Sequence, residues 1–327
     1  MSCATSSKEF TYAEVLRWAA EQTLSTEFET QPSCDVTTPL FTGTVIAHTV
    51  QPGLTVTASD LVYADDNHMG AHIEASVTCG VLIEGTSGRL VCEGIDPIEF
   101  KPQRAQIIGV DEPVSGALHW RKGQRSRVAG LDLKTEFFER FSDQADDQSL
   151  ASLQSFMDGR PQIRQLPHSP RILQIANHCF SQTYLGTLGQ LFHEANALNF
   201  VFEITRLLEE RQSLTNLIGT RRYDQTMQAR EILDASLNAP PKTLDLGRMV
   251  GTNVTTLQAN FKAAFGTTIF GYIREQRLEM ARYLLLDHGL KVSEAGYRVG
   301  FSSPAAFSSA YRRRFGHPPS VDSAAGK

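Results

Sequence analysis

The chain has 327 residues, of which 41% are hydrophobic and 20% charged, and its formal net charge is -5. This is the composition of an ordinary globular protein that is long enough for two domains. No stretch approaches the roughly 18 apolar residues of a membrane-spanning helix, and the N-terminal MSCATSSKEF lacks the basic start and apolar segment of a signal peptide. We therefore expect a cytoplasmic protein with no membrane partner.

The cysteines argue against covalent cross-links and structural metal. There are five, and no two of them form a Cys-x-x-Cys pair. An odd, scattered set is not typical of a disulfide framework or a structural zinc site, and it indicates a reducing compartment. The cysteines are Cys3, Cys34, Cys79, Cys92 and Cys179.

The net charge is divided unevenly along the chain. Residues 224–327 contain 13 Lys and Arg against 9 Asp and Glu, a net charge of +4, which leaves -9 for residues 1–223. Electrostatic attraction is a property of one domain or face, so the overall negative charge does not exclude a polyanionic partner. The asymmetry fits a basic binding module joined to an acidic domain with another role.

The N-terminal part is predicted to be rich in strands. After an amphipathic segment at residues 8–22, residues 41–135 are rich in Val, Ile, Thr and Gly and contain alternating runs such as LTVTASDLVYA. Alternation with period two is typical of half-buried strands. Residues 85–88 (GTSG) have the chemistry of a hairpin loop, so we expect a hairpin there within a small sandwich or barrel.

From about residue 136 the hydrophobic period becomes helical. Residues 171–210 are predicted to form two helices that are broken near residues 186–189, where two glycines stand. Residues 211–223 are polar and are the candidate linker. The helical spacing rests on a set of apolar residues: Leu173, Ala176, Phe180, Leu188, Leu191, Phe192, Ala195, Leu198 and Phe202.

The C-terminal part contains an internal repeat. Residues 246–266 (LGRMVGTNVTTLQANFKAAFG) align with residues 295–316 (AGYRVGFSSPAAFSSAYRRRFG), with Gly251 matching Gly300. Each copy is typical of a helix, a short glycine turn and a second helix. Gly247 and Gly296 provide the small residue that a close helix crossing requires, at a cost of about 1 kcal/mol each relative to Ala in a helix.

The second helix of each copy has recognisable ends and faces. Asn253 and Ser303 stand where an N-cap accepts a backbone hydrogen bond, and Pro304 takes the favoured first helical position. Apolar residues recur at i, i+4 and i+8, so each helix has one buried stripe and an opposite face that is free to meet a partner such as the DNA major groove. The two stripes are Leu257, Phe261 and Phe265, and Phe307, Tyr311 and Phe315.

Residues 268–287 between the copies are compatible with one continuous helix. A helix of this length extends about 30 Å, close to the roughly 34 Å of one turn of B-DNA, so it can set two helices into successive major grooves. The alternative is an all-α packing domain, but two matching copies joined by such a spacer favour DNA binding. The apolar positions of the spacer are Phe270, Ile273, Leu278, Ala281, Leu284 and Leu285.

Residues 270–286 (FGYIREQRLEMARYLLL) and 292–320 (VSEAGYRVGFSSPAAFSSAYRRRFGHPPS) resemble the C-terminal signature of the AraC/XylS family of regulators. The resemblance implies a DNA-binding domain with two helix-turn-helix units at residues 224–327. It also implies a protein that activates or represses promoters, often as a homodimer, with an N-terminal domain that senses a small molecule. Double-stranded DNA, a small-molecule effector and a second copy are the implied partners, and RNA polymerase is a further candidate.

The family motif also implies which residues contact DNA. Lys262, Arg312 and Arg313 are expected to bind phosphates, although the last arginines also fit a charged helix end that the helix dipole favours. Ala259 and Ser309 stand where some members carry arginine, the commonest reader of guanine, so DNA shape, water and methyl contacts gain weight in the readout. The residues expected to face base edges are Thr255, Gln258, Ala259, Ala305, Ser308 and Ser309.

Residues 170–204 are similar to the siderophore-responsive, pyochelin-regulator-type (PchR-like) subgroup, which makes a ferric siderophore one candidate effector. The implied fold is α+β, with a cupin-like β-rich domain and a helical dimerisation segment at residues 1–210, before the linker and the all-α domain. The implied dimerisation residues are equally compatible with core positions of their own domain. They are Leu188, Leu191, Ala195 and Leu198.

Two clusters in the N-terminal half invite a ligand, and for both the simpler interpretation is favoured. His48, His68, His72 and His119 suggest a metal because cupin-like barrels hold iron, but no carboxylate stands at a cupin spacing, so we predict surface histidines and no metal or cofactor. The second cluster suits either an anionic ligand or, as we expect, a solvated loop. It consists of Arg121, Lys122, Arg125 and Arg127.

The sequence leaves three functions open. The leading hypothesis is a sequence-specific transcription regulator, not an enzyme, whose action changes when an effector binds its N-terminal domain. The second is a metal-dependent enzyme in the barrel with a DNA-binding tail, which requires bound iron or manganese. The third is a DNA-binding protein without an effector, whose thermal midpoint no ligand raises.

Overall fold

The computed structural model describes residues 8–21, 26–29, 37–93, 95, 97–141, 150–181, 183–286 and 289–325. Contacts divide the chain into two units, Met1–Glu210 and Arg211–Lys327. Cys3 and Cys34 lie outside the described residues. Within the described part of the chain, no helix is both long and apolar enough to cross a membrane.

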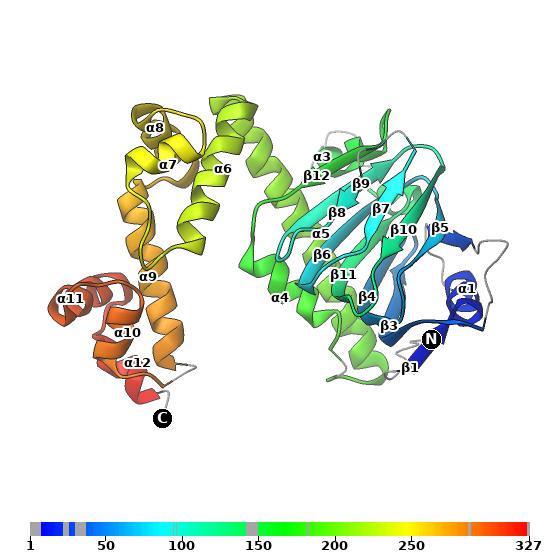
Figure 1. Cartoon of the computed structure of the whole chain (residues 1–327), viewed down its shortest axis with the longest axis horizontal. Coiled ribbons are helices and arrows are strands. Elements are labelled where there is room, and N and C mark those ends of the chain that lie inside the picture. Colours follow the sequence, from blue (N-terminus) through cyan, green and yellow to red (C-terminus); the bar gives the residue numbers. More distant parts are fainter. Residues whose placement is uncertain are drawn as a thin grey trace. The chain divides into compact units, whose positions relative to one another are not determined.

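The first unit contains two antiparallel sheets (Figure 1). The larger sheet has seven strands in the order β1-β3-β4-β11-β6-β9-β12, and the smaller has five in the order β2-β5-β10-β7-β8. The strands are β1 (Lys8–Thr11), β2 (Thr26–Glu29), β3 (Pro39–Gln51), β4 (Leu54–Tyr63), β5 (Asn67–Ile73), β6 (Ser76–Gly85), β7 (Arg89–Cys92), β8 (Ile98–Glu99), β9 (Ala105–Val110), β10 (Val114–Trp120), β11 (Arg125–Leu133) and β12 (Gln162–Gln165).

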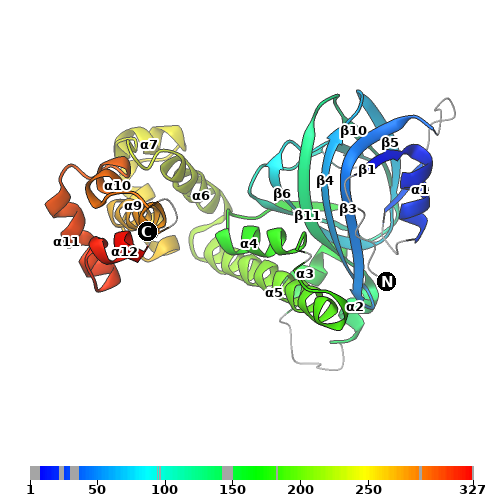
Figure 2. The ribbon, with the colours of Figure 1, turned by 90° about the horizontal axis from the view of Figure 1, so that it is seen from below.

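Helices accompany the larger sheet, as Figures 1 and 2 show for α4 and α5. Ser169 caps α4 because its side chain accepts a hydrogen bond from the backbone N–H of Ile172 at 3.3 Å. The helices of this unit are α1 (Tyr12–Glu21), α2 (Thr135–Glu139), α3 (Ala151–Gln154), the 3-10 helix η1 (Ser155–Met157), α4 (Pro170–His178) and α5 (Gly186–Ile218), whose last turns belong to the second unit.

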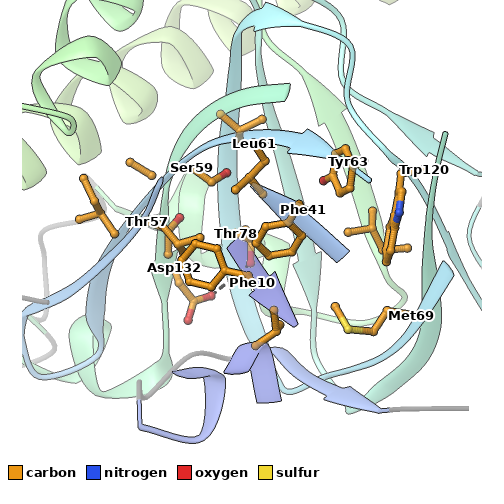
Figure 3. A pocket seen from close by; sticks show the side chains of 16 residues that line it. Phe10, Phe41, Thr57, Ser59, Leu61, Tyr63, Met69, Thr78, Trp120 and Asp132 are labelled. Carbon is orange, nitrogen blue, oxygen red and sulfur yellow. Dashed lines mark hydrogen bonds between the residues drawn. The ribbon is translucent and has the colours of Figure 1, made fainter. Parts of the chain in front are cut away.

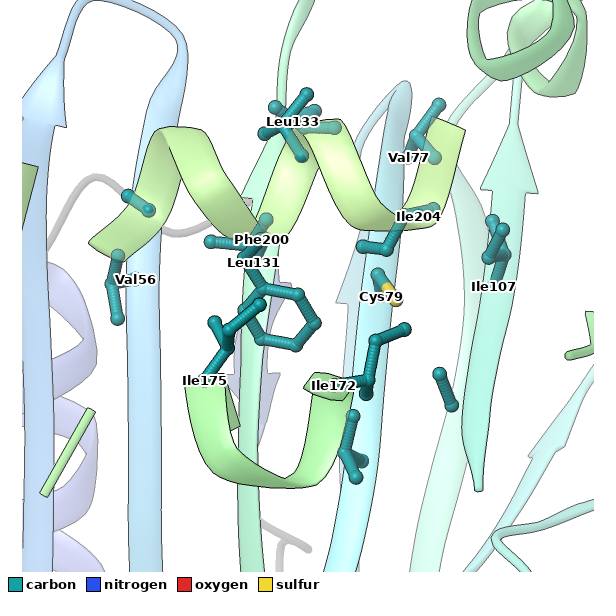
Figure 4. Close-up of a cluster of buried hydrophobic side chains, with 14 of the residues drawn as sticks. Val56, Val77, Cys79, Ile107, Leu131, Leu133, Ile172, Ile175, Phe200 and Ile204 are labelled. Carbon is teal, nitrogen blue, oxygen red and sulfur yellow. The ribbon is translucent and has the colours of Figure 1, made fainter. Parts of the chain in front are cut away.

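Side-chain alternation gives the larger sheet two different faces. Leu131 and Leu133 of β11 belong to a buried cluster with Ile175 of α4 and Phe200 of α5, which Figure 4 shows. Asp132, between the two leucines, lines a cavity on the opposite face. Burial of the helix-facing side chains stabilises the unit, since each fully buried Leu, Ile or Phe contributes about 1.5–3 kcal/mol.

The structure corrects the hairpin that was expected at residues 85–88. β6 belongs to the larger sheet and β7 to the smaller one, so this segment crosses between sheets instead of joining two paired strands. Gly85 has φ +85°, and a Cβ there would lie 2.1 Å from the carbonyl oxygen of Arg125. The glycine that favours a hairpin is required here for a sheet crossing.

Helix and strand boundaries also differ from the expectation. The break between the two helices lies at residues 179–185, and Gly186 begins α5, with Gly189 inside it. Strands β1 and β2 precede residue 41, and β12 follows residue 135. The expected linker at residues 211–223 is helical on both sides of Gly219, whose φ is +85°.

The second unit is entirely helical in its described residues and has two cores. One core joins α6, α7, α8 and the first half of α9, and the other joins the second half of α9 to α10 and α11. The helices are α6 (Thr220–Ala235), α7 (Thr243–Met249), α8 (Val254–Phe265), α9 (Ile269–Leu286), α10 (Val292–Arg298), α11 (Pro304–Phe315) and α12 (Pro319–Ala325).

Candidate nucleic-acid interface

The first candidate recognition helix, α8, begins and ends at the residues that the repeat predicts. The side chain of Asn253 accepts a hydrogen bond from the backbone N–H of Thr256 at 2.8 Å, and Gly266 ends the helix in the left-handed conformation. Leu257 and Phe261 are fully buried. The helix is thus held by one stripe, and its opposite face is exposed.

The second candidate recognition helix, α11, repeats this construction. Ser303 Oγ accepts a hydrogen bond from the backbone N–H of Ala306 at 3.2 Å, Pro304 is the first helical residue, and Gly316 provides the left-handed end. Its stripe begins with Phe307 and continues with Tyr311, and both are fully buried.

The two turns require glycine for the reasons that the sequence suggests. Gly251 and Gly300 follow the first helix of each copy. Their φ angles are +71° and +90°, values that residues with a Cβ atom rarely adopt. A Cβ on Gly296 would lie 2.9 Å from the Phe307 ring, and one on Gly247 would lie 3.0 Å from the carbonyl oxygen of Thr252. The close approach predicted for these helix pairs is therefore confirmed.

The residues expected to contact DNA lie on the faces opposite the stripes. Of the expected base-contact set, Ser308 is half-buried and the other residues are exposed. The expected phosphate-contact residues Lys262, Arg312 and Arg313 are also exposed. Their position makes them available to a ligand, and their contact with DNA stays a prediction.

The spacer helix α9 has 18 residues and so extends about 27 Å. Ile273 packs in the first core and Leu278 in the second, so one helix supports both helix-turn-helix units. Phe270, which was expected on the apolar face, is 70% exposed. It borders an open groove instead, because its position on α9 faces away from the first core.

Arg277 in the middle of α9 joins the two helix-turn-helix units. Its Nε donates to the carbonyl oxygen of Leu237 at 2.8 Å and its Nη2 to that of Asn238 at 3.1 Å, both just beyond α6. Its Nη1 donates to the carbonyl oxygen of Gly300, in the turn of the second helix-turn-helix unit, at 2.9 Å. Burial lowers the pKa of Arg277, but an arginine remains charged at neutral pH.

Two hollows extend the basic surface beyond the recognition helices. Lys242, Arg274 and Arg313 border a groove of about 600 Å³ between α7, α9 and α11. Arg221 and Arg222 of α6 border a second hollow of about 600 Å³, together with residues at the start of α8. Sequence reasoning missed Arg221, Arg222 and Arg274 because they lie outside the repeat, although the adjacent pair at the start of α6 was a visible signal of charge.

The matches to protein families cover both units. Residues 42–218, more than half of the chain, match the family described as Regulatory protein PchR N-terminal domain. Residues 246–323 match a family described as Helix-turn-helix domain. The chain belongs to the PchR-type regulators of the AraC/XylS family.

Two curated relatives and one solved structure show the extent of the similarity. This AraC-family regulator is 35% identical to Regulatory protein PchR of Pseudomonas aeruginosa over 137 residues. The aligned segment covers 41% of this chain and 46% of that protein. It is 32% identical over 110 residues to HTH-type transcriptional regulator GlxA of Rhizobium meliloti, 34% of each chain. The chain thus spans less than half the length of these relatives. A transcriptional regulator structure from Chromobacterium violaceum with an AraC-type DNA-binding domain is 33% identical, covering 31% of this chain and 90% of that one, with a TM-score of 0.30.

The histidines of this AraC-family regulator do not gather into one site. His68 and His119 lie opposite each other on β5 and β10 with rings stacked at 4.9 Å. His48 lies beside His193 of α5 instead, and His72 is part of β5. No group of three potential metal ligands occurs among the residues that the structure describes.

The basic cluster near β11 is engaged with acidic side chains. Lys122 Nζ lies 3.1 Å from Asp65 Oδ1, and Arg125 Nη2 lies 3.1 Å from Asp60 Oδ2. Arg127 Nε is 3.9 Å from the same carboxylate of Asp60. These pairs offset the positive charge of Lys122, Arg125 and Arg127, which argues against an anionic ligand. The expectation of a solvated loop is wrong for Arg125 and Arg127, because both belong to strand β11.

The expected dimerisation residues are exposed on α5. Leu188 is 59% exposed, Leu191 57% and Leu198 38%, and Ala195 is also exposed. The alternative that these four residues belong to the core of their own domain is therefore wrong. Leu185, directly before α5, is 82% exposed as well, and sequence reasoning did not include it.

Proposed function

We propose that this regulator recognises a bipartite site in double-stranded DNA, with α8 and α11 entering successive major grooves. The observation that carries the proposal is that two helices with the same caps and buried stripes keep their opposite faces exposed, within one unit supported by α9. An α9 of about 27 Å is of the same order as the roughly 34 Å of one turn of B-DNA.

Each exposed face has a defined task in this proposal. Gln258 has the amide geometry to bind adenine with two hydrogen bonds, while the short side chains around it contact thymine methyls or water. Lys262, Arg312 and Arg313 bind phosphates on either side of the grooves. Arg221 and Arg274 extend the contact along the backbone. The second unit supports this role with 16 Lys and Arg against 9 Asp and Glu in residues 211–327.

We further propose that a small-molecule effector in the first unit changes the action of the regulator on DNA. Two sheets with a cavity between them support this role, and the PchR-type resemblance makes a ferric siderophore one candidate. The metal-dependent enzyme has no such support, because His48, His68, His72 and His119 are absent from the cavity lining.

Homodimerisation through α5 is the third part of the proposal. Leu188, Leu191 and Leu198 form an apolar strip at helical spacing, and exposed apolar strips of this kind mark protein interaction sites. A second copy of the chain is the occupant because the same strip on two copies is self-complementary about a twofold axis. Such a dimer would carry two DNA-binding domains, each with two recognition helices.

Selection of bound sequences from a random double-stranded library by the full chain tests the DNA proposal. We expect enriched sites with two blocks whose centres lie about 10–11 base pairs apart, one helical turn. A single enriched block, or no enrichment, would contradict it. Thermal unfolding of the full chain against metabolites and ferric chelates tests the effector, because a ligand of the folded state raises the midpoint.

A further inference from the structure

The structure extends the internal repeat of the second unit by one helix in each copy. Figure 1 shows α9 between the pair α7 and α8 and the pair α10 and α11. Core residues of α6, α7 and α8 have counterparts in α9, α10 and α11, so each candidate recognition helix belongs to a bundle of three helices. The paired core residues are Ala229 and Ala281, Leu233 and Leu285, Leu246 and Ala295, Val250 and Val299, Leu257 and Phe307, and Phe261 and Tyr311.

A hydrogen bond to the turn glycine occupies the same place in both copies. Gln225 Nε2 of α6 donates to the carbonyl oxygen of Gly251 at 2.9 Å. In the second copy, Arg277 Nη1 of α9 donates to the carbonyl oxygen of Gly300 at 2.9 Å. Both carbonyl groups belong to the turn before the candidate recognition helix, so the first helix of each copy holds this turn in the same way. Gln225 and Arg277 are therefore equivalent residues.

A contact between an arginine and an aromatic ring gives the same alignment. The guanidinium carbon of Arg230 lies 5.5 Å from the centre of the Phe265 ring. That of Arg282 lies 4.8 Å from the centre of the Phe315 ring. Arg230 and Arg282 each follow the glycine-binding side chain of their helix by five residues. Two separate contacts thus align α6 with α9 residue by residue.

This alignment pairs two exposed arginines. Arg222 lies three residues before Gln225 in α6. Arg274 lies three residues before Arg277 in α9. Both Arg222 and Arg274 are exposed, and neither forms an ion pair in the described part of the chain. Their charges are therefore available to a ligand.

Each of the two arginines borders a hollow beside the start of a candidate recognition helix. The hollow at Arg222 is also lined by Thr256, in the first turn of α8. The hollow at Arg274 is also lined by Ala306, in the first turn of α11. Thr256 and Ala306 are equivalent, because the backbone N–H of each donates to the N-cap side chain of its helix. The two arginines thus lie at equivalent points beside α8 and α11.

A phosphate group of DNA is the ligand that this position fits. In a helix-turn-helix domain the start of the recognition helix meets base edges in the major groove, while the first helix crosses the sugar-phosphate backbone. A side chain beside that start therefore faces the backbone at the rim of the groove. Arginine binds phosphate oxygens through two parallel N–H donors, so its contact fixes orientation as well as adding attraction.

We propose that Arg222 and Arg274 are equivalent phosphate-binding residues, one beside each recognition helix. Each binds the backbone at the matching position of its half-site, so the two phosphates lie about 10–11 base pairs apart, one helical turn. This inference rests on the proposed bipartite recognition and goes beyond it, because it assigns one arginine to each half-site and predicts where both contacts fall.

The salt dependence of binding tests whether each arginine contacts a phosphate. Arg222→Gln and Arg274→Gln remove the charge but keep a good helix former. We expect each variant to reduce the slope of log affinity against log salt by about 1, and the double variant by about 2, on selected and on random DNA. Arg314→Gln is the matched control and should keep the parent slope, since Arg314 Nη2 lies 2.9 Å from Glu279 Oε1. A parent slope in Arg222→Gln or Arg274→Gln would overturn the proposal.

Neutral methylphosphonates, placed one at a time in the selected duplex, locate the two contacts. Fluorescence anisotropy with the full chain measures the affinity for each duplex. We expect one replacement in the α8 half-site to weaken binding of the parent chain about tenfold and to leave binding of Arg222→Gln unchanged. The replacement at the matching position of the α11 half-site should weaken the parent chain similarly and leave Arg274→Gln unchanged. Contacts at different positions in the two half-sites would overturn the equivalence.

The proposed function and this inference fail separately. Selection of a single block, or of none, would reject bipartite recognition, and the salt slopes on random DNA would still test both arginines. Selection of two blocks with the parent slope in both variants would reject the assignment of the arginines and keep bipartite recognition.

Discussion

Arg277 holds the turn of the second helix-turn-helix unit through Gly300: its Nη1 donates to the Gly300 carbonyl oxygen at 2.9 Å, and a Cβ on Gly300 would lie 2.8 Å from Nη2. The same guanidinium binds the carbonyl oxygens of Leu237 and Asn238, which follow α6. One side chain thus fixes the end of α6 against the second turn, and only glycine leaves room for it.

Arg277→Gln should lower the free energy of unfolding of the second unit by about 2 kcal/mol, because carbonyl oxygens lose a charged donor. Urea unfolding followed by circular dichroism measures this. Arg298→Gln, on the exposed side of α10, is the control and should change stability by less than about 0.5 kcal/mol. The Arg277 variant should also lose more affinity for a complete bipartite site than for either half, and equal losses would show that Arg277 does not set the spacing.

Gln258→Ala should weaken binding to the selected site by about 1–3 kcal/mol, because the amide of Gln258 reads a base edge. Binding to random DNA should change little, since phosphate contacts remain. Fluorescence anisotropy with both DNAs makes the comparison. A loss of the same size on selected and random DNA would contradict direct readout by this residue.

Arg312→Ala should weaken binding to all sequences by similar factors and reduce the slope of log affinity against log salt by about 1, because one phosphate contact is lost. Arg314→Ala is the matched control on the same helix, since Arg314 Nη2 already lies 2.9 Å from Glu279 Oε1. Titrations at several salt concentrations decide the point. A slope equal to that of the parent chain would assign Arg312 to the helix end alone.

Leu191→Glu should abolish self-association, because a charge would be placed in the centre of the apolar strip on α5. Analytical ultracentrifugation of the full chain measures the change. Leu217→Glu, 68% exposed on the same helix but distant from the strip in sequence, should leave the oligomeric state unchanged. If the Leu191 variant sediments like the parent chain, α5 is not the dimer interface.

Acidification should destabilise the first unit through His48. Burial and the neighbouring His193 lower the pKa of His48 below 6.5, so the unfolded chain takes up the proton first. The stabilising contribution is therefore complete above about pH 6.5 and is lost as the pH falls below that value.

Tryptophan fluorescence follows this unfolding selectively, because both tryptophans of the chain, Trp18 and Trp120, belong to the first unit. His48→Gln should reduce the loss of thermal midpoint between about pH 7.5 and 5.5. The same change at His72 is the control, since that ring contacts Ser115 on the exposed surface. A pH dependence identical to that of the parent chain would exclude His48 as its source.

Sequence by itself determined the two helix-turn-helix repeats of the second unit, but not the helices at residues 211–235. The repeat fixed the caps Asn253 and Ser303, the turn glycines and the buried stripes, because these depend on residues a few positions apart along the chain. The same local rules located the exposed faces of α8 and α11.

Tertiary structure alone decided the features that join distant segments. They are the sheet crossing at Gly85, the contact of Arg277 with Gly300, and the cavity that both Trp120 and Asp132 line (Figure 3). Each depends on residues from separate parts of the chain. Local propensity carries no information about such pairings, because their free energy comes from packing and hydrogen bonds that exist only once the chain has folded. The helix period therefore predicted α5, while only the packed sheets revealed which of its leucines stay exposed.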